Sequence, residues 1–366
     1  MSNAISMYAL SLEECVKLIV HGAGTTLAEG HMGVGKSSML PMVGKLLPGH
    51  KLCYFDCTTK CDAGDIALPQ FHLIDEQGCV TYVPNEEIGI HLDGPIVLMI
   101  DEIGKAVKPV QNGMLRLMHE QKFGTKSLHP DSKVFATTNL GAEGVGDLLL
   151  PHMLNRMTRV RIRKSTNLEY IEYGLNNDVH HTILGWCKDT PALFQSFEDV
   201  ENPDENPYIF HPQQQRAAFT TNRSLSRASD WLKVRDAGHI DDRMLTSALI
   251  GTMGDRAALD CMAFVTLADQ LPSQDSIKET PESAMVPTSA AAVCMVVFRT
   301  LGNIEKSWVD AWMTYFKRLD TEAQGMFVNG VRAETYGKEK QSVIMQNKQF
   351  TEWCMHNTHL YSADKK

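Results

Sequence analysis

The sequence predicts an α/β protein in which a parallel five-stranded sheet is flanked by helices and followed by an all-helical region. Short apolar runs alternate with amphipathic stretches from about residue 10 to residue 163, and the β pattern then fades. Such runs are typical of strands buried on both faces, and their alternation with helices favours a parallel sheet. The five predicted strands cover residues 25–28, 52–55, 96–100, 133–138 and 158–162.

Helical periodicity dominates the rest of the chain. The predicted helices cover residues 168–174, 179–187, 191–197, stretches within 223–271, 289–301, 306–318, 323–331 and 349–357. Two polar segments that contain proline, 198–221 and 272–288, are predicted as loops. These changes of pattern predict three domains, which are an α/β domain over 1–163, a helical domain over 164–275 and a helical extension over 276–366.

The composition excludes intrinsically disordered, collagen-like and coiled-coil chains. Of 366 residues, 43% are hydrophobic and 22% are charged, which is typical of a globular chain with a large core. No apolar run approaches the roughly 20 residues that span a bilayer, and the N-terminus lacks the order of a signal peptide. The nine cysteines are therefore expected to be reduced, buried thiols. We expect a soluble, cytoplasmic protein without a membrane segment.

The charge balance disfavours nucleic acid as the main partner. The chain has 35 basic and 44 acidic residues, a formal net charge of −9. A protein that neutralises many phosphates usually shows a basic balance or a basic stripe. The densest basic stretch is 155–164 (NRMTRVRIRK), and its arginines are interpreted below as candidates for contact with a nucleotide.

Residues Gly30–Ser37 have the sequence GHMGVGKS, which fits G-x-x-x-x-G-K-[ST] between a predicted strand and a helical stretch. In this pattern backbone N–H groups converge on phosphates, and the following helix N-terminus favours negative charge. Lys36 would reach the terminal phosphates and Ser37 would bind Mg²⁺. His31 is expected to face solvent, and the alternative is a position near the phosphates. The alternative is a glycine-rich turn without a ligand. The predicted nucleotide-binding residues are Gly30, Gly33, Gly35, Lys36, Ser37 and Ser38.

The run PIVLMIDE predicts a buried strand that ends at Asp101 and Glu102. A carboxylate at the end of a strand near a phosphate loop is where Mg²⁺ finds its second protein partner. Asp101 is therefore the predicted metal-proximal residue, and Glu102 is predicted to orient or deprotonate the attacking water. The alternative is that the two acids only end a strand and cap a helix.

Polar residues follow or precede two further predicted strands. Asn139 follows KVFATT and is predicted to hold the attacking water near the γ-phosphate, although an asparagine in this place is commonly a turn residue. Arg156 and Arg159 lie before or at the start of the fifth strand. An arginine there would reach the nucleotide of a neighbouring subunit, a contribution of roughly 10³–10⁵ in rate. The alternatives are a surface ion pair and a contact with nucleic-acid phosphates.

Together these residues resemble the AAA+ ATPases, and most closely their MoxR-type branch. GHMGVGKS resembles the Walker A motif, IVLMIDE resembles Walker B, and ATTN resembles sensor 1 with Asn139 as the sensor. LLPHMLNRMTRVRI is similar to the segment with the arginine finger, for which Arg156 is the first candidate and Arg159 the second. TTNRSLSRASDWL is similar to the sensor 2 helix, where Arg223 matches the family's arginine and Arg227 competes with it.

The resemblance covers about residues 10–275 and implies how the protein works. It implies a P-loop NTPase domain, a helical lid over 164–275, and ATP with Mg²⁺ bound between them. It also implies a homo-oligomeric ring, usually of six subunits, because the arginine acts in trans. Members of the family remodel or activate protein partners, and a candidate partner is a separate protein with a von Willebrand factor A domain.

Residues 65–84 fall where the family places a hairpin insert that faces the ring axis. The resemblance makes Leu68, Pro69, Gln70 and Phe71 candidates for contact with a threaded or docked substrate. The alternative is an ordinary packed hairpin, in which these side chains serve only the fold.

Two other functions compete with a protein-remodelling ATPase. A nucleic-acid motor of the same family would need a basic channel, which the net charge disfavours. A monomeric P-loop kinase would need an acceptor site but no trans arginine. ATP is favoured over GTP because the chain has no N-K-x-D motif that reads a guanine base.

Overall fold

The computed structural model describes residues 8–74, 77–143, 149, 151–214 and 216–358. The chain divides into two compact units, Met1–Lys164 and Ser165–Lys366, and each is described by itself. Within the described residues, no helix is both long and apolar enough to cross a membrane.

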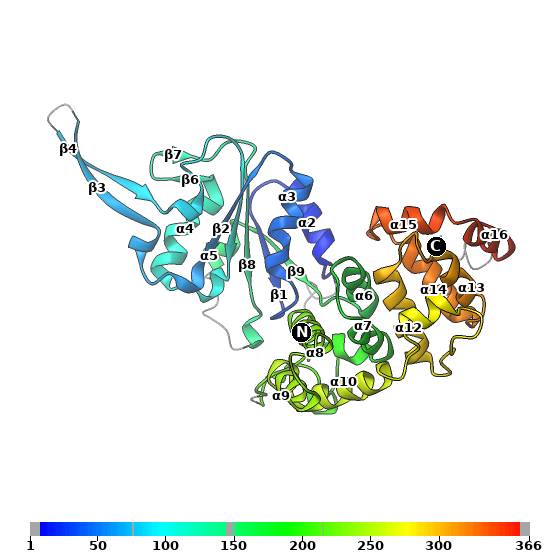
Figure 1. The fold of residues 1–366 in the computed structure, drawn as a ribbon. Helices are drawn as coiled ribbons and strands as arrows, with labels where there is room; N and C mark the ends of the chain where they lie inside the picture. The colour runs from blue at the N-terminus through cyan, green and yellow to red at the C-terminus, as the bar shows by residue number, and fades with distance from the viewer. Residues whose placement is uncertain (1–7, 75–76, 144–148, 150, 215, 359–366) are drawn as a thin grey trace. The chain divides into compact units, whose positions relative to one another are not determined.

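A five-stranded parallel sheet forms the centre of the first unit (Figure 1). Its strands are β1 (Thr26–Gly30), β2 (Lys51–Asp56), β5 (Ile96–Asp101), β8 (Lys133–Thr138) and β9 (Thr158–Ile162). They lie in the order β2-β5-β8-β1-β9, and every neighbouring pair is parallel. The predicted arrangement is confirmed, because this parallel five-stranded sheet is flanked by helices and followed by a helical region.

Strand β5 shows how the sequence specifies a sheet that is covered on both faces. All six of its residues are buried. Val97 and Met99 pack with helices α2 (Leu12–His21) and α3 (Met39–Leu46). The alternating residues Ile96, Leu98 and Ile100 pack instead with α4 (Lys108–Glu120). A near-continuous apolar run therefore supplies two cores at once, which is the property expected of a central parallel strand.

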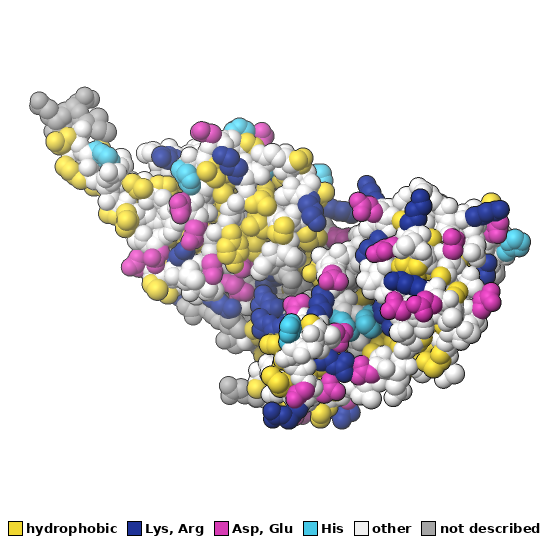
Figure 2. Space-filling model, in the orientation of Figure 1, with side chains coloured by type: hydrophobic (Ala, Val, Ile, Leu, Met, Phe, Trp, Pro, Cys, Tyr) yellow, Lys and Arg dark blue, Asp and Glu magenta, His cyan; other side chains and the backbone are white. Residues whose placement is uncertain are grey.

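Two antiparallel hairpins extend the first unit. One pairs β3 (Ala67–Ile74) with β4 (Gln77–Pro84), and the other pairs β6 (Lys122–Phe123) with β7 (Lys126–Ser127). The β3–β4 hairpin projects from the unit (Figure 1) and has apolar side chains along its length (Figure 2). Leu68 and Phe71 are 63% and 67% exposed, so they are not packed as in an ordinary hairpin. Their contact with a substrate stays a prediction.

The second unit is helical throughout its described part. Its helices are α6 (Asn167–Asn176), α7 (His181–Asp189), α8 (Asn222–Asp236), α9 (Asp242–Met253), α10 (Asp255–Ala268), α11 (Gln274–Glu279), α12 (Ala290–Asn303), α13 (Val309–Phe316), α14 (Thr321–Arg332), α15 (Lys338–Met345) and α16 (Lys348–His356). Two of them, α11 and α15, were not expected from the sequence. The predicted helix at 191–197 is a 3₁₀ turn, Pro191–Phe194.

One hydrophobic cluster runs through the second unit. It includes Leu225 and Leu249 from the predicted lid as well as Trp312 and Phe327 from the predicted extension. The predicted boundary at 275 thus falls inside a shared core, and the division into lid and extension stays a prediction.

The cysteines agree only in part with the expectation of buried thiols. All nine are free, and six are buried, but Cys61 is exposed and two others are half-buried. Burial raises the pKa of the Cys57 thiol to about 12, so that thiol is protonated at neutral pH. Within the described residues, no group of three or more histidine, cysteine or acidic residues is placed to hold a metal ion.

Candidate nucleotide-binding site

The predicted site residues of the first unit follow three neighbouring strands. The glycine-rich loop follows β1, Asp101 and Glu102 lie at the end of β5, and Asn139 follows β8. The order β5-β8-β1 and the parallel pairing place these carboxyl ends side by side. Ligands of open α/β sheets bind at this edge.

The glycine-rich loop has the backbone that its sequence predicts. Gly33 and Gly35 have φ values of 70° and 103°, a region that favours glycine. A Cβ on Gly35 would also lie 3.1 Å from Cδ1 of Leu12. Lys36–Ser38 form a 3₁₀ turn that leads into α3, and the side chains of Ser37 and Ser38 are exposed. The loop therefore turns back on itself and leaves two hydroxyl groups accessible at the start of a helix.

Lys36 is buried and points into the loop that contains it. Its Nζ atom donates to the carbonyl oxygens of Gly30 and His31, both at 3.0 Å, and to Oδ1 of Asn139. Burial lowers the pKa of Lys36, and the negative charge of Glu102 is the largest opposing effect. Three acceptors therefore hold the ammonium group, and a bound phosphate would compete with them for its N–H donors.

Asn139 connects the lysine to the catalytic candidate Glu102. Its Oδ1 accepts from Lys36, while its Nδ2 donates to Oε2 of Glu102 at 2.9 Å. The two bonds fix the orientation of the amide. Lys105 also lies 3.2 Å from Oε2 of Glu102, so the carboxylate is held from two sides.

Asp101 is fixed by two hydroxyl groups from neighbouring strands. Tyr54 on β2 donates to its Oδ2 at 2.7 Å, and Thr137 on β8 donates to its Oδ1. Thr137 Oγ1 in turn accepts the backbone N–H of Glu102 at 3.1 Å. Burial and the bond to Asp101 raise the pKa of Tyr54, so Tyr54 stays a donor at neutral pH. The sequence did not predict a role for either hydroxyl group.

Glu102 has an unusual backbone at the point where β5 ends. Its φ is 53°, in the left-handed region that non-glycine residues adopt rarely. Strained backbone of this kind is frequent where side chains are held for function. In this chain the Glu102 carboxylate accepts from Asn139, while the Asp101 carboxylate accepts from the two hydroxyl groups.

Ser37 and Asp101 are a chemically suitable pair for Mg²⁺. This ion prefers oxygen ligands and is commonly held by one or two protein groups, with water and phosphate completing its shell. The exposed Ser37 hydroxyl and the anchored Asp101 carboxylate supply such oxygens.

His31 is where the sequence-based prediction is wrong. It is 5% exposed and does not face solvent. Its Nδ1 lies 2.9 Å from Oε1 of Glu143, a residue in the 3₁₀ turn Gly141–Glu143 that follows β8. No local pattern indicates this pair, because its members are 112 positions apart.

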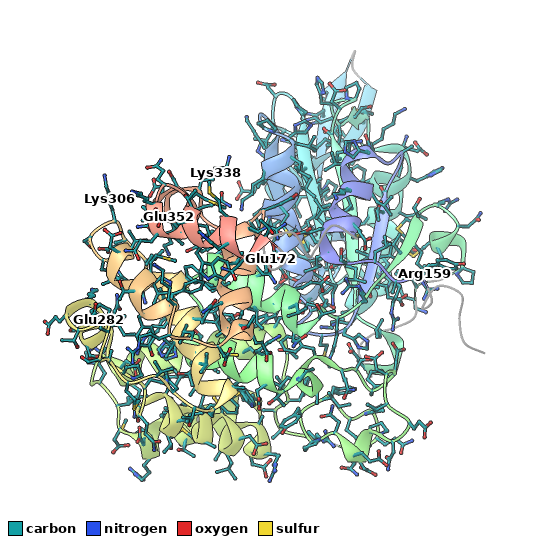
Figure 3. The ribbon with its side chains drawn as sticks, turned by 90° about the vertical axis from the view of Figure 1, so that its right-hand side faces the viewer. Arg159, Glu172, Glu282, Lys306, Lys338 and Glu352 are labelled. Atoms are coloured by element: carbon teal, nitrogen blue, oxygen red, sulfur yellow. The ribbon has the colours of Figure 1, made fainter. Side chains whose placement is uncertain are left out.

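The arginine candidates differ in what they contact. Arg159 lies on the edge strand β9 (Figure 3), and its Nη2 is 2.6 Å from Oε2 of Glu29 on β1. Arg156 is exposed, and no ion pair of it is found within the described residues. Of the two arginines, only Arg159 forms an ion pair within the described residues, and the role of Arg156 stays a prediction.

The sensor 2 candidates lie on α8 in the second unit. The helix begins at Asn222 with Thr221 as its N-cap. Arg223 and Arg227 are both exposed and one turn apart. The choice between them stays a prediction.

Comparisons with known proteins give a weak match in structure only. No family model and no curated protein matches the chain. The chain is similar to the Thermotoga maritima RuvB Holliday junction branch migration motor at 17% identity and a TM-score of 0.37, covering 81% of this chain and 85% of that chain. For a lysine-to-arginine mutant of the same protein the values are 15%, 0.39, 84% and 87%. Similarity this low assigns no family and no function.

Proposed function

We propose that this chain is an ATPase of the AAA+ class that hydrolyses ATP with Mg²⁺. The observation that carries the proposal is the connection of Lys36, Asn139 and Glu102 by hydrogen bonds at the edge of the sheet. A phosphate-binding lysine, a polar amide and a carboxylate base are the groups that ATP hydrolysis needs in one place. In this chain they come from three separate strand ends.

Each residue has a defined task in this proposal. The loop N–H groups and Lys36 bind the phosphates, and Lys36 exchanges Asn139 for a phosphate oxygen. Asn139 then holds the attacking water, and Glu102 accepts its proton. Mg²⁺, held through Ser37 and Asp101, supplies positive charge that offsets the charge of the phosphate oxygens.

The ring and the trans arginine belong to the same proposal. Arg156 is exposed and makes no ion pair within the described residues, which supports its action on the nucleotide of a neighbouring subunit. Arg159 is engaged by Glu29. The complete enzyme is then a homo-oligomer, for which six subunits are expected. Arg223 is the proposed lid residue that contacts the nucleotide.

The proposed output is the remodelling or activation of a protein partner, as in the MoxR-type branch. The exposed apolar side chains of the β3–β4 hairpin, including Leu68 and Phe71, support contact with another protein. A separate protein with a von Willebrand factor A domain is the candidate partner. We expect both proteins to be cytoplasmic.

A nucleic-acid motor is the second candidate function, and the distribution of charge favours keeping it. The net charge of −9 comes almost entirely from the second unit, because residues 1–164 contain 16 basic and 17 acidic side chains. The overall balance therefore does not describe the ATPase unit. Nucleic acid therefore stays open as a partner of residues 1–164.

The test is phosphate release from ATP–Mg²⁺ by the full chain over a range of protein concentrations. We expect turnover per subunit to rise with protein concentration, because the arginine finger acts between subunits. We also expect GTP to be a poorer substrate than ATP. Nucleotide binding without any phosphate release would contradict the proposal. Turnover per subunit that is independent of concentration, in a monomer, would favour the kinase alternative. Stimulation by single-stranded or junction DNA would favour the nucleic-acid motor.

A further inference from the structure

The His31–Glu143 pair connects the phosphate loop to the segment after β8. Besides the contact with the His31 ring, the Glu143 carboxylate accepts the backbone N–H of Met32, with Oε2 at 3.0 Å and Oε1 at 3.3 Å. The side chains of His31 and Glu143 are 6% and 2% exposed. One buried carboxylate thus holds both a side chain and the backbone at the first turn of the loop.

The Glu143 carboxylate and the phosphate loop stabilise each other. A buried carboxylate is costly unless hydrogen bonds or a charge compensate it. Within the described part of the chain, no lysine or arginine lies within ion-pair distance of Glu143, and its side-chain hydrogen-bond partner is the His31 ring. The His31 ring and the Met32 N–H supply its hydrogen bonds, and the positive charge of Lys36 also interacts favourably with it. These interactions favour one loop conformation over others.

The loop is joined to the segment after β8 at two points that behave differently. One is the bond between Lys36 and Asn139, and the other is the His31–Glu143 pair. In the proposed function Lys36 leaves Asn139 to bind a phosphate. The contacts of Glu143 involve neither Lys36 nor the glycines at positions 33 and 35, so they can persist through that exchange.

We propose that Glu143 is a positioning residue that holds the phosphate loop in its nucleotide-binding shape through His31 and the Met32 N–H. The inference rests on the proposed function, since it concerns the same nucleotide site. Glu143 acts through the loop and not on the reacting atoms. Its loss should weaken the binding of nucleotide phosphates more than it slows the chemical step.

Titration of the full chain with a fluorescent ADP analogue, N-methylanthraniloyl-ADP, without Mg²⁺ tests this inference. Glu143→Ala should raise the Kd about tenfold or more, because it removes hydrogen bonds of a charged group. Glu143→Gln, which keeps the shape and one acceptor oxygen, should raise it by a smaller factor of about three. Glu120→Ala is the matched control, since its carboxylate pairs with Arg116 on an exposed helix face, and should leave the Kd unchanged.

A double-mutant cycle separates positioning from a general loss of stability. If His31 and Glu143 act as one unit, the double variant His31→Ala/Glu143→Ala should bind no more weakly than Glu143→Ala alone. In steady-state assays KM for ATP should rise while kcat at saturation stays within about threefold. Thermal unfolding of each variant shows whether it is folded, and the isosteric Gln variant serves if the Ala variant is not.

The outcomes distinguish this inference from the proposed function. An unmodified chain that binds no nucleotide would overturn the proposed function and this inference with it. An unmodified chain that binds normally, beside a folded Glu143 variant with unchanged Kd, would overturn only the positioning role. Strictly additive effects of the two substitutions, or a loss confined to kcat, would overturn it as well.

Discussion

Nδ2 of Asn139 donates to Oε2 of Glu102 at 2.9 Å, so the residue predicted to hold the attacking water is already bonded to the residue predicted to deprotonate it. The same amide accepts from Lys36 on its other side. A change at the phosphates that moves Lys36 would therefore alter the environment of Glu102 through one side chain. In the proposed mechanism, this arrangement would couple the binding of phosphate by Lys36 to the environment of the Glu102 carboxylate.

Lys36→Ala should weaken ATP binding about tenfold or more. Hydrogen bonds to charged groups contribute about 1.5–3 kcal/mol, and each 1.4 kcal/mol is a factor of ten in affinity. Isothermal titration with ATP measures the effect. Lys45→Ala, an exposed lysine on the following helix α3, is the control and should bind normally. Tight ATP binding by a folded Lys36→Ala variant would remove the phosphate-loop assignment.

Arg156→Ala should leave ATP binding intact and slow hydrolysis by a factor of roughly 10³–10⁵, the usual contribution of an arginine finger. Arg159→Ala should have a small effect, because that guanidinium pairs with Glu29 and is partly exposed. Single-turnover phosphate release compares the two variants. The reverse order of effects would make Arg159 the finger.

Mixing experiments then test whether the arginine acts in trans. Subunits with Arg156→Ala retain their own Lys36 and Glu102, and so should hydrolyse ATP when a neighbour supplies an intact arginine. Adding subunits that carry Lys36→Ala, which have the arginine but bind ATP poorly, should restore turnover. A mixture with no more activity than its separate components would contradict action between subunits.

Tyr54→Phe should raise the Mg²⁺ concentration that gives half-maximal hydrolysis by about tenfold, the lower range of effects seen when a residue that orients a metal ligand is changed. Its hydroxyl is one of the two that fix Asp101. Mg²⁺ titrations at saturating ATP provide the measurement. Tyr82→Phe on the exposed β3–β4 hairpin is the matched control. An unchanged Mg²⁺ dependence in Tyr54→Phe would mean that Thr137 alone holds Asp101.

The sheet could be predicted from sequence because its signals are local. Strand β5 is a run of six buried residues, and the glycine-rich loop follows β1 within one short segment, so pattern and motif fall in the same window. The positions of Asp101, Glu102 and Asn139 at one edge then follow from parallel pairing. Their grouping is a consequence of topology, once the strands are known.

The interactions that the sequence did not reveal are contacts between distant segments. Tyr54 reaches Asp101 across 47 positions, and His31 reaches Glu143 across 112. A histidine in a polar loop gives no local sign that it will be buried. Helix α11 was missed for a related reason, since its six residues are too few to show periodicity and are held by tertiary packing through Ile277.

The measurement that tests the central claim most directly is single-turnover phosphate release from ATP–Mg²⁺ by Glu102→Gln beside the unmodified chain. Gln keeps the hydrogen bond capacity toward Asn139 but accepts no proton, so ATP should bind normally and release should slow by a factor of roughly 10²–10⁴. Glu120→Gln, an exposed glutamate on α4, should behave like the unmodified chain. Equal rates for Glu102→Gln and the unmodified chain would contradict the assignment of Glu102 as the base, and with it the proposed hydrolytic site.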